Sequence, residues 1–139
     1  MFTGTINCFL TVFNKIIETD LSVNRISSLH FSTGDYYNRC NFNIAKTYNF
    51  DLSPYYNAGL IKSLTIVFSA DDHGYVSING TTYIRTYGQD LDTHYATVPE
   101  TSIKPINSIT LWAEEDQPYP LCSHDNLTGS QATIIINYK

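Results

Sequence analysis

Residues 63–87 read SLTIVFSADDHGYVSINGTTYIRTY, and this stretch decides the fold class. Its first part alternates small polar side chains with an apolar set made of Leu64, Ile66, Phe68 and Ala70. A period of two is typical of a strand with one face on a core. Val76 and Ile78 resume the alternation, and Asn79-Gly80 follows, a dipeptide that favours a type I′ hairpin. The stretch therefore predicts three strands separated by tight turns.

Similar patterns recur on both sides of this stretch. Candidate strands cover residues 8–17, 41–48, 81–87, 108–113 and 132–138. One helical candidate spans residues 20–29, and turn-forming residues between 114 and 129 predict a long crossing loop. Aromatic residues make up 14% of the chain, which also favours strands. We expect an all-β protein, an antiparallel β-sandwich or jelly roll, with residues 1–139 in a single domain.

Composition excludes several classes of function. The chain has only 8 Lys and Arg residues and a net charge of −5, so it lacks the positive charge that binds phosphate groups, and we expect no nucleic-acid partner. No apolar run is long enough to predict a membrane span, and the first residues lack the basic start of a signal peptide. The three cysteines, Cys8, Cys40 and Cys122, are widely spaced, which favours buried free thiols over a single disulfide with one cysteine left over.

Residues 63–80 resemble the strand, Asp-Asp turn, strand and Asn-Gly turn of two groups of β-sandwich carbohydrate-binding domains. These are the galactose-binding-like jelly rolls and the lectin-like domain of anthrax protective antigen. In lectins of the second group, an adjacent Asp pair holds a calcium ion that also binds sugar hydroxyls. The resemblance implies that Asp71 and Asp72 are metal ligands here, with calcium as cofactor and a glycan as ligand. The alternative is an ordinary Asx-type turn leading into Gly74.

Other polar residues offer weaker hypotheses for chemistry. The remaining oxygen ligands of a calcium ion would come from Asp90, Asp92, Asp125 or Asn126. A separate cation site would use Asp90, Asp92 and His94, which share a face of an extended chain. A glycosidase pair would need two converging carboxylates among Glu100, Glu114, Glu115 and Asp116. The sequence holds no nucleophile elbow and no phosphate-binding Gly loop, and we expect no enzyme.

Tyrosines in predicted loops are the other route to recognition. Tyrosine combines a rigid apolar surface with a polar tip, which suits contacts with sugars or proteins. The predicted ligand-binding residues are Tyr36, Tyr37, Tyr55 and Tyr56, with Tyr119 as a further exposed candidate. The competing interpretation is that these rings close the ends of the sandwich.

These observations predict a non-enzymatic component of a virus or phage particle, associated with a capsid, spike or fibre. It would form a homo-oligomer and bind host glycans or another structural protein. The alternative is a stand-alone calcium-dependent lectin or carbohydrate-binding module, extracellular if the chain is cut from a secreted protein. A small glycoside hydrolase is the least favoured hypothesis.

Overall fold

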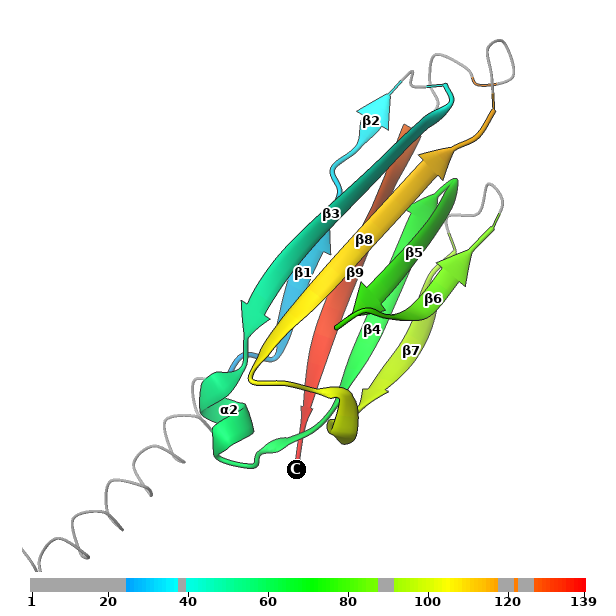
Figure 1. The fold of residues 1–139 in the computed structure, drawn as a ribbon. Coiled ribbons are helices and arrows are strands. Elements are labelled where there is room, and N and C mark those ends of the chain that lie inside the picture. The colour runs from blue at the N-terminus through cyan, green and yellow to red at the C-terminus, as the bar shows by residue number, and fades with distance from the viewer. Residues whose placement is uncertain (1–24, 38–39, 88–91, 118–121, 123–126) are drawn as a thin grey trace, which may run out of the picture.

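The computed structural model describes residues 25–37, 40–87, 92–117, 122 and 127–139 (Figure 1). Nearly all regular structure in these residues is β-strand. The elements are β1 (Ser28–Ser32), β2 (Tyr36–Tyr37), β3 (Phe42–Asp51), α2 (Ser53–Asn57), β4 (Ile61–Asp71), β5 (His73–Ile78), β6 (Thr81–Thr86), β7 (His94–Pro99), the 3-10 turn η1 (Glu100–Ser102), β8 (Ile106–Glu115) and β9 (Leu127–Tyr138).

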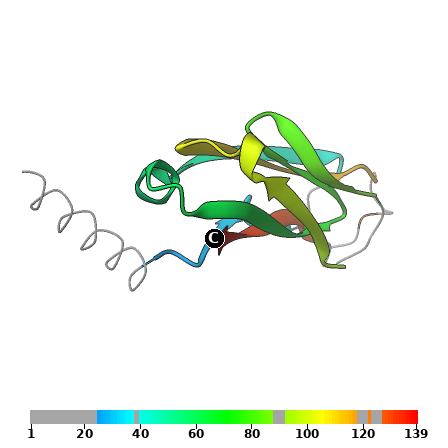
Figure 2. The ribbon, with the colours of Figure 1, turned by 90° about the horizontal axis from the view of Figure 1, so that it is seen from below.

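The strands form two antiparallel sheets that pack face to face, as Figure 2 shows from one end. We call them the β1 sheet, with strand order β1-β9-β4-β7 and β2 added beside β9, and the β3 sheet, with order β3-β8-β5-β6. In each sheet, one of the last two strands lies between earlier ones: β9 lies between β1 and β4, and β8 lies between β3 and β5. This interleaving is the strand order of a jelly roll, and the two packed sheets confirm the predicted all-β sandwich.

The core forms because every long strand carries an apolar inward face. On β4, all four residues of the predicted apolar set are buried, and β8 and β9 contribute Ile109, Leu111, Ile134 and Ile136. Most outward positions between them hold Ser, Thr, Asn or Gln, although Val67, Trp112 and Ile135 also point outward. Side chains from the two inner faces therefore meet in one continuous apolar cluster.

The predicted Asn-Gly hairpin joins β5 to β6. Asn79 and Gly80 have φ angles of 51° and 84°, the left-handed conformation that a type I′ turn requires at both positions. The Asn79 side chain also accepts a 2.9 Å hydrogen bond from the Ser108 N–H and donates one of 2.9 Å to Asn107 Oδ1. The turn is thus fastened to the neighbouring strand β8.

Three local predictions were wrong. The described part of the candidate helix at 20–29 is not helical, because Leu29 and Phe31 pack on the core from strand β1, which pairs with β9. The Asp71-Asp72 pair does not make the predicted tight turn between neighbouring strands, since β4 and β5 belong to different sheets. The loop after β8 is shorter than predicted, because β8 continues to Glu115 and β9 begins at Leu127. The candidate strand at 8–17 lies outside the described residues.

Candidate functional site

The Asp pair lies where the chain crosses from one sheet to the other. Asp71, the last residue of β4, pairs with Gly129 of β9, whereas His73, the first residue of β5, pairs with Glu114 of β8. Asp72 is the single residue between these strands, and its side chain is only 3% exposed. This crossing places a carboxyl group in the interior at one end of the sandwich.

A second carboxyl group meets it there. The inward positions of β8 are Ile109, Leu111, Ala113 and then Glu115, which is only 1% exposed. Glu115 Oε1 accepts a 2.8 Å hydrogen bond from the Gln117 N–H. The sequence analysis named Glu115 only as a possible glycosidase acid. The strict alternation of β8 was the signal that would have predicted an inward carboxyl group.

The environment of Asp72 favours its uncharged form. Within the described part of the chain, neither carboxyl oxygen of Asp72 meets a hydrogen-bond donor. Burial raises the pKa of Asp72 to about 8, and the neighbouring Glu115 and Asp71 carboxyl groups act in the same direction. Two buried carboxylates this close repel each other. At neutral pH the pair therefore needs a shared proton or a bound cation.

More unsatisfied polar atoms lie on β9 at this end of the sandwich. Thr128 Oγ1 and Ser130 Oγ are buried and have no hydrogen-bond partner among the described residues. Next to them is a hollow of about 180 Å³, lined in part by Asp35, Asp71 and Ser130. Gly129 lets Asp35 approach, because a Cβ atom at Gly129 would lie 3.0 Å from Asp35 Oδ1. The described residues thus bring several carboxyl and hydroxyl oxygens to this region, and oxygen ligands are what a hard cation prefers.

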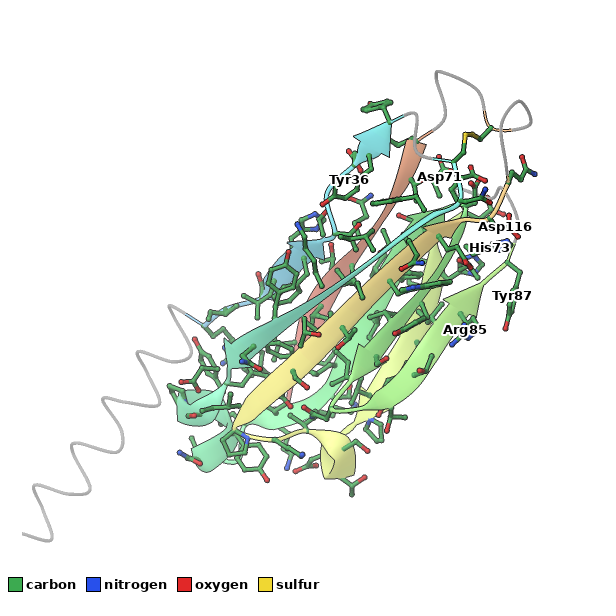
Figure 3. The ribbon with its side chains drawn as sticks, turned by 45° about the horizontal axis from the view of Figure 1, so that its top comes forward. Tyr36, Asp71, His73, Arg85, Tyr87 and Asp116 are labelled. Atoms are coloured by element: carbon green, nitrogen blue, oxygen red, sulfur yellow. A yellow bond between two sulfur atoms is a disulfide. The ribbon has the colours of Figure 1, made fainter. Side chains whose placement is uncertain are left out.

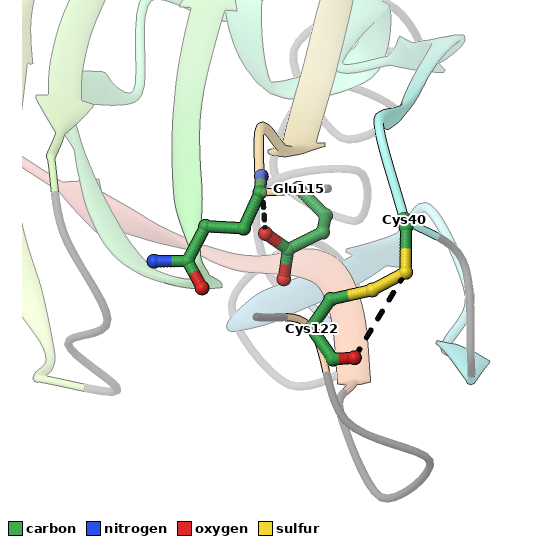
Figure 4. The surroundings of a disulfide bond; sticks show 4 residues. Cys40, Glu115 and Cys122 are labelled. Carbon is green, nitrogen blue, oxygen red and sulfur yellow. Dashed lines mark hydrogen bonds between the residues drawn. A yellow bond between two sulfur atoms is a disulfide. The ribbon is translucent and has the colours of Figure 1, made fainter. Parts of the chain in front are cut away.

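A disulfide closes the same end. Cys40 and Cys122 are bonded across 82 residues of sequence, so the expectation of free thiols was wrong for this pair (Figure 4). Cys40 precedes β3, whereas Cys122 lies between β8 and β9, and the two come together because β3 and β8 are neighbours in the sheet. The spacing of the cysteines in the sequence does not predict that Cys40 and Cys122 pair. Cys8 lies outside the described residues.

The predicted tyrosines divide between the two ends of the sandwich. Tyr36 pairs with Thr128 of β9, and Asp71 pairs with the next residue, Gly129. Tyr36 and Tyr37 therefore lie at the end of the sandwich that holds Asp71, Asp72 and Glu115, which we call the acidic end (Figure 3). These two tyrosines form the short strand β2 instead of a loop. Tyr37 is 61% exposed, whereas the Tyr36 ring packs 5.1 Å from the Phe42 ring.

At the opposite end, Tyr55 and Tyr56 lie in α2, not in a loop. Tyr55 is only 6% exposed, and its hydroxyl accepts a 3.1 Å hydrogen bond from the Ile26 N–H. Its ring packs edge-on against Tyr138, where burial raises the pKa of the Tyr138 hydroxyl to about 12. Tyr55 therefore plugs this end of the core. Tyr56 is 40% exposed and lines a hollow of about 420 Å³ with Ile61, Glu100 and Ile103.

The other predicted chemistry finds less support. Among the described residues, no three Asp, Glu, His or Cys side chains converge closely enough to ligate one metal ion. Asp92 is exposed before β7, and Asp90, Tyr119, Asp125 and Asn126 lie outside the described residues. Glu100 pairs with Lys139 at 2.7 Å, far along the sandwich from Glu115. In the part of the chain that is described, no helix has the length and apolar character needed to cross a membrane.

The protein is thus an antiparallel jelly roll in which the acidic end holds a buried pair of carboxyl groups, those of Asp72 and Glu115. Comparison with protein-family models and with curated protein sequences finds no match.

Proposed function

We propose that this chain is a non-enzymatic recognition domain that binds a glycan with the help of a calcium ion held by Asp71 and Asp72. The observation that carries the proposal is the Asp72 carboxyl group, which is 3% exposed, meets no hydrogen-bond donor among the described residues, and lies beside the Glu115 carboxyl group. A cation at this point would neutralise both groups.

The surroundings suit calcium better than a transition metal. Calcium takes about six to eight oxygen ligands, including hydroxyl, carbonyl and water oxygens. Asp72 and Glu115 supply buried carboxylates, the Ser130 hydroxyl oxygen is buried at the same end, and Asp71 lines the hollow there. The exposed ring of Tyr37 lies at the same end and would contact a bound sugar.

Hydrolysis is a weaker explanation for the same carboxyl pair. A glycosidase needs both acids to reach the bond that breaks. Glu115 and Asp72 are 1% and 3% exposed, so a sugar chain cannot contact both. A cation, in contrast, can occupy a buried position. We therefore propose binding and not catalysis.

The test is calcium-dependent stability and glycan binding of the whole chain. In wild-type protein at pH 7.5, calcium at 100 times its Kd should raise the free energy of unfolding by about 2.7 kcal/mol over the value in EDTA. Asp72→Asn should lose this gain, whereas Glu100→Gln, which changes a 54% exposed carboxylate far from Glu115, should keep it. The calcium-dependent part of binding to a glycan array should follow the same pattern. Equal stability of the wild type with calcium and with EDTA would contradict the proposal.

A second candidate function is assembly into a virus or phage particle as a homo-oligomer. One observation favours it, namely the outer face of the β1 sheet. This face carries the exposed side chains of Tyr95 and Ile135, at 69% and 37%. No Asp, Glu, Lys or Arg occurs in the strand segments that build it, residues 28–32, 63–69, 95–99 and 131–137. A broad face without charge is suited to contact with another protein surface.

The assembly hypothesis predicts a defined oligomer by analytical ultracentrifugation. Thr97→Glu would place a charge on the uncharged face and should dissociate the oligomer. Thr82→Glu, an exposed position on the other sheet, should leave it intact. A monomeric wild-type protein at high concentration would exclude this candidate.

The disulfide is typical of an oxidising compartment, which agrees with a proposed location outside the cell or on a virion.

A further inference from the structure

Aromatic and charged side chains gather on the outer face of the β3 sheet, whereas the neighbouring Asp72 and Glu115 are buried. Trp112 on β8, Tyr75 on β5 and Arg85 on β6 are direct cross-strand neighbours. The Trp112 and Tyr75 rings stack with centroids 5.4 Å apart, and the Arg85 guanidinium lies 4.9 Å from the centre of the Tyr75 ring. Three planar groups thus form a continuous row across the sheet.

One step closer to the strand ends, polar groups border this row. His73 pairs with Glu114 across β5 and β8, and His73 Nε2 lies 3.2 Å from Asp116 Oδ2. Tyr87 follows β6 and packs edge-on against His73 with ring centroids 6.2 Å apart, although Tyr87 is 74% exposed. Figure 3 shows Arg85, Tyr87, His73 and Asp116 gathered at this corner of the sheet.

A hollow of about 180 Å³ lies at this corner, where Trp112 and Tyr87 supply the aromatic surface; its polar lining includes His73, Arg85, Glu114 and Asp116. A volume below that of drug-sized pockets suits one small ring. Arg85 offers paired N–H donors, whereas Glu114 and Asp116 offer paired acceptors, and both geometries match neighbouring hydroxyl groups.

We propose that this hollow binds one uncharged pyranose ring of a glycan, independently of calcium. The sugar's C–H face would pack on an aromatic ring, and its hydroxyls would bond to Arg85, Glu114 and Asp116. An anionic sugar is disfavoured because the two carboxylates outnumber the single guanidinium that lines the hollow. The proposal does not depend on the Asp71–Asp72 site, which lies on the other side of the crossing between the sheets.

The chain contains a single tryptophan, so the Trp112 indole N–H signal in a ¹⁵N-labelled sample reports directly on this hollow. We would titrate the methyl glycosides of glucose, galactose, mannose and N-acetylglucosamine in EDTA, with N-acetylneuraminic acid as the anionic comparison. At least one neutral glycoside should shift the Trp112 signal saturably, with a Kd on the order of millimolar as expected for so small a ligand.

Two variants locate the binding. Tyr87→Ala and Arg85→Ala should each weaken the neutral glycoside by about tenfold, as for central contact residues. Lys104→Ala removes an exposed positive charge that does not line this hollow and should change nothing. Dispersed spectra of all three variants would show that they fold. No saturable Trp112 shift with any neutral glycoside, unchanged affinity in both site variants, or tighter binding of the anionic sugar would overturn the proposal.

Discussion

Replacing Asp72 by Asn should stabilise the protein at neutral pH and leave it unchanged in acid. In the unfolded chain this carboxyl group ionises near its ordinary pKa of 3.8, whereas in the folded chain it keeps its proton up to about pH 8. Between these values the folded state binds one more proton. The free energy of unfolding therefore falls by about 1.4 kcal/mol for each unit that the pH rises. At pH 7 the loss reaches at most about 4 kcal/mol.

The amide that Asp72→Asn introduces has no such proton to lose and can donate to Glu115 as the carboxylic acid does. The assay is urea denaturation of both proteins in EDTA from pH 4 to pH 8. The two curves should coincide near pH 4 and separate steadily above it, with the variant more stable by up to about 4 kcal/mol at pH 7. Glu115→Gln should shift stability in the same direction, because it removes the like charge from the pair. Parallel curves for wild type and Asp72→Asn would refute the buried pair.

Further substitutions test the fold. Cys40→Ser should lower the free energy of unfolding, measured by urea denaturation, by about 4 to 5 kcal/mol, because the disulfide closes a loop across a separation of 82 residues. If Cys40 and Cys122 both react as free thiols in unfolded, unreduced wild-type protein, the disulfide is contradicted. Gly74→Ala places a Cβ against the Ala70 Cβ and the Trp112 carbonyl oxygen and should destabilise by about 1 to 3 kcal/mol. Gly80 has open space around it but a φ of 84°, so Gly80→Ala should destabilise the protein by only about 1 to 2 kcal/mol. A larger loss of stability in Gly80→Ala than in Gly74→Ala would contradict the close packing around Gly74. Leu111→Ala should cost about 2 to 5 kcal/mol, whereas a loss below about 1 kcal/mol would show that the strand is not in the core.

The sequence predicts the fold wherever one strand carries its own signal. The apolar alternation of β4 and the Asn79-Gly80 turn are local patterns, and both appear in the structure as expected. Strand β1 gives a weaker signal, because Leu29 and Phe31 alternate with polar residues over only five positions, and the strand forms by pairing with β9. Tertiary pairing there overrides a weak local preference.

The site was predictable only in part for the same reason. The Asp71-Asp72 pair correctly indicates which end of the molecule holds the site. Glu115, however, is 43 positions from Asp72 in the sequence, and the two residues come together only when β5 and β8 pair. Tyr55 shows the opposite error, since a tyrosine between turn residues is equally suited to exposure and to closing the core. Which of these occurs depends on Tyr138 at the far end of the chain.

The acidic end combines two opposite contributions to stability. The Asp72–Glu115 pair weakens the folded state at neutral pH by up to about 4 kcal/mol, and the Cys40–Cys122 disulfide beside it strengthens the folded state by a similar amount. An apolar residue at position 72 would remove the first cost and make the second unnecessary. A chain shaped only for stability has no reason to keep both. A binding function explains the combination, because the carboxyl pair provides the charge that a cation needs and the disulfide holds that end together when the cation is absent.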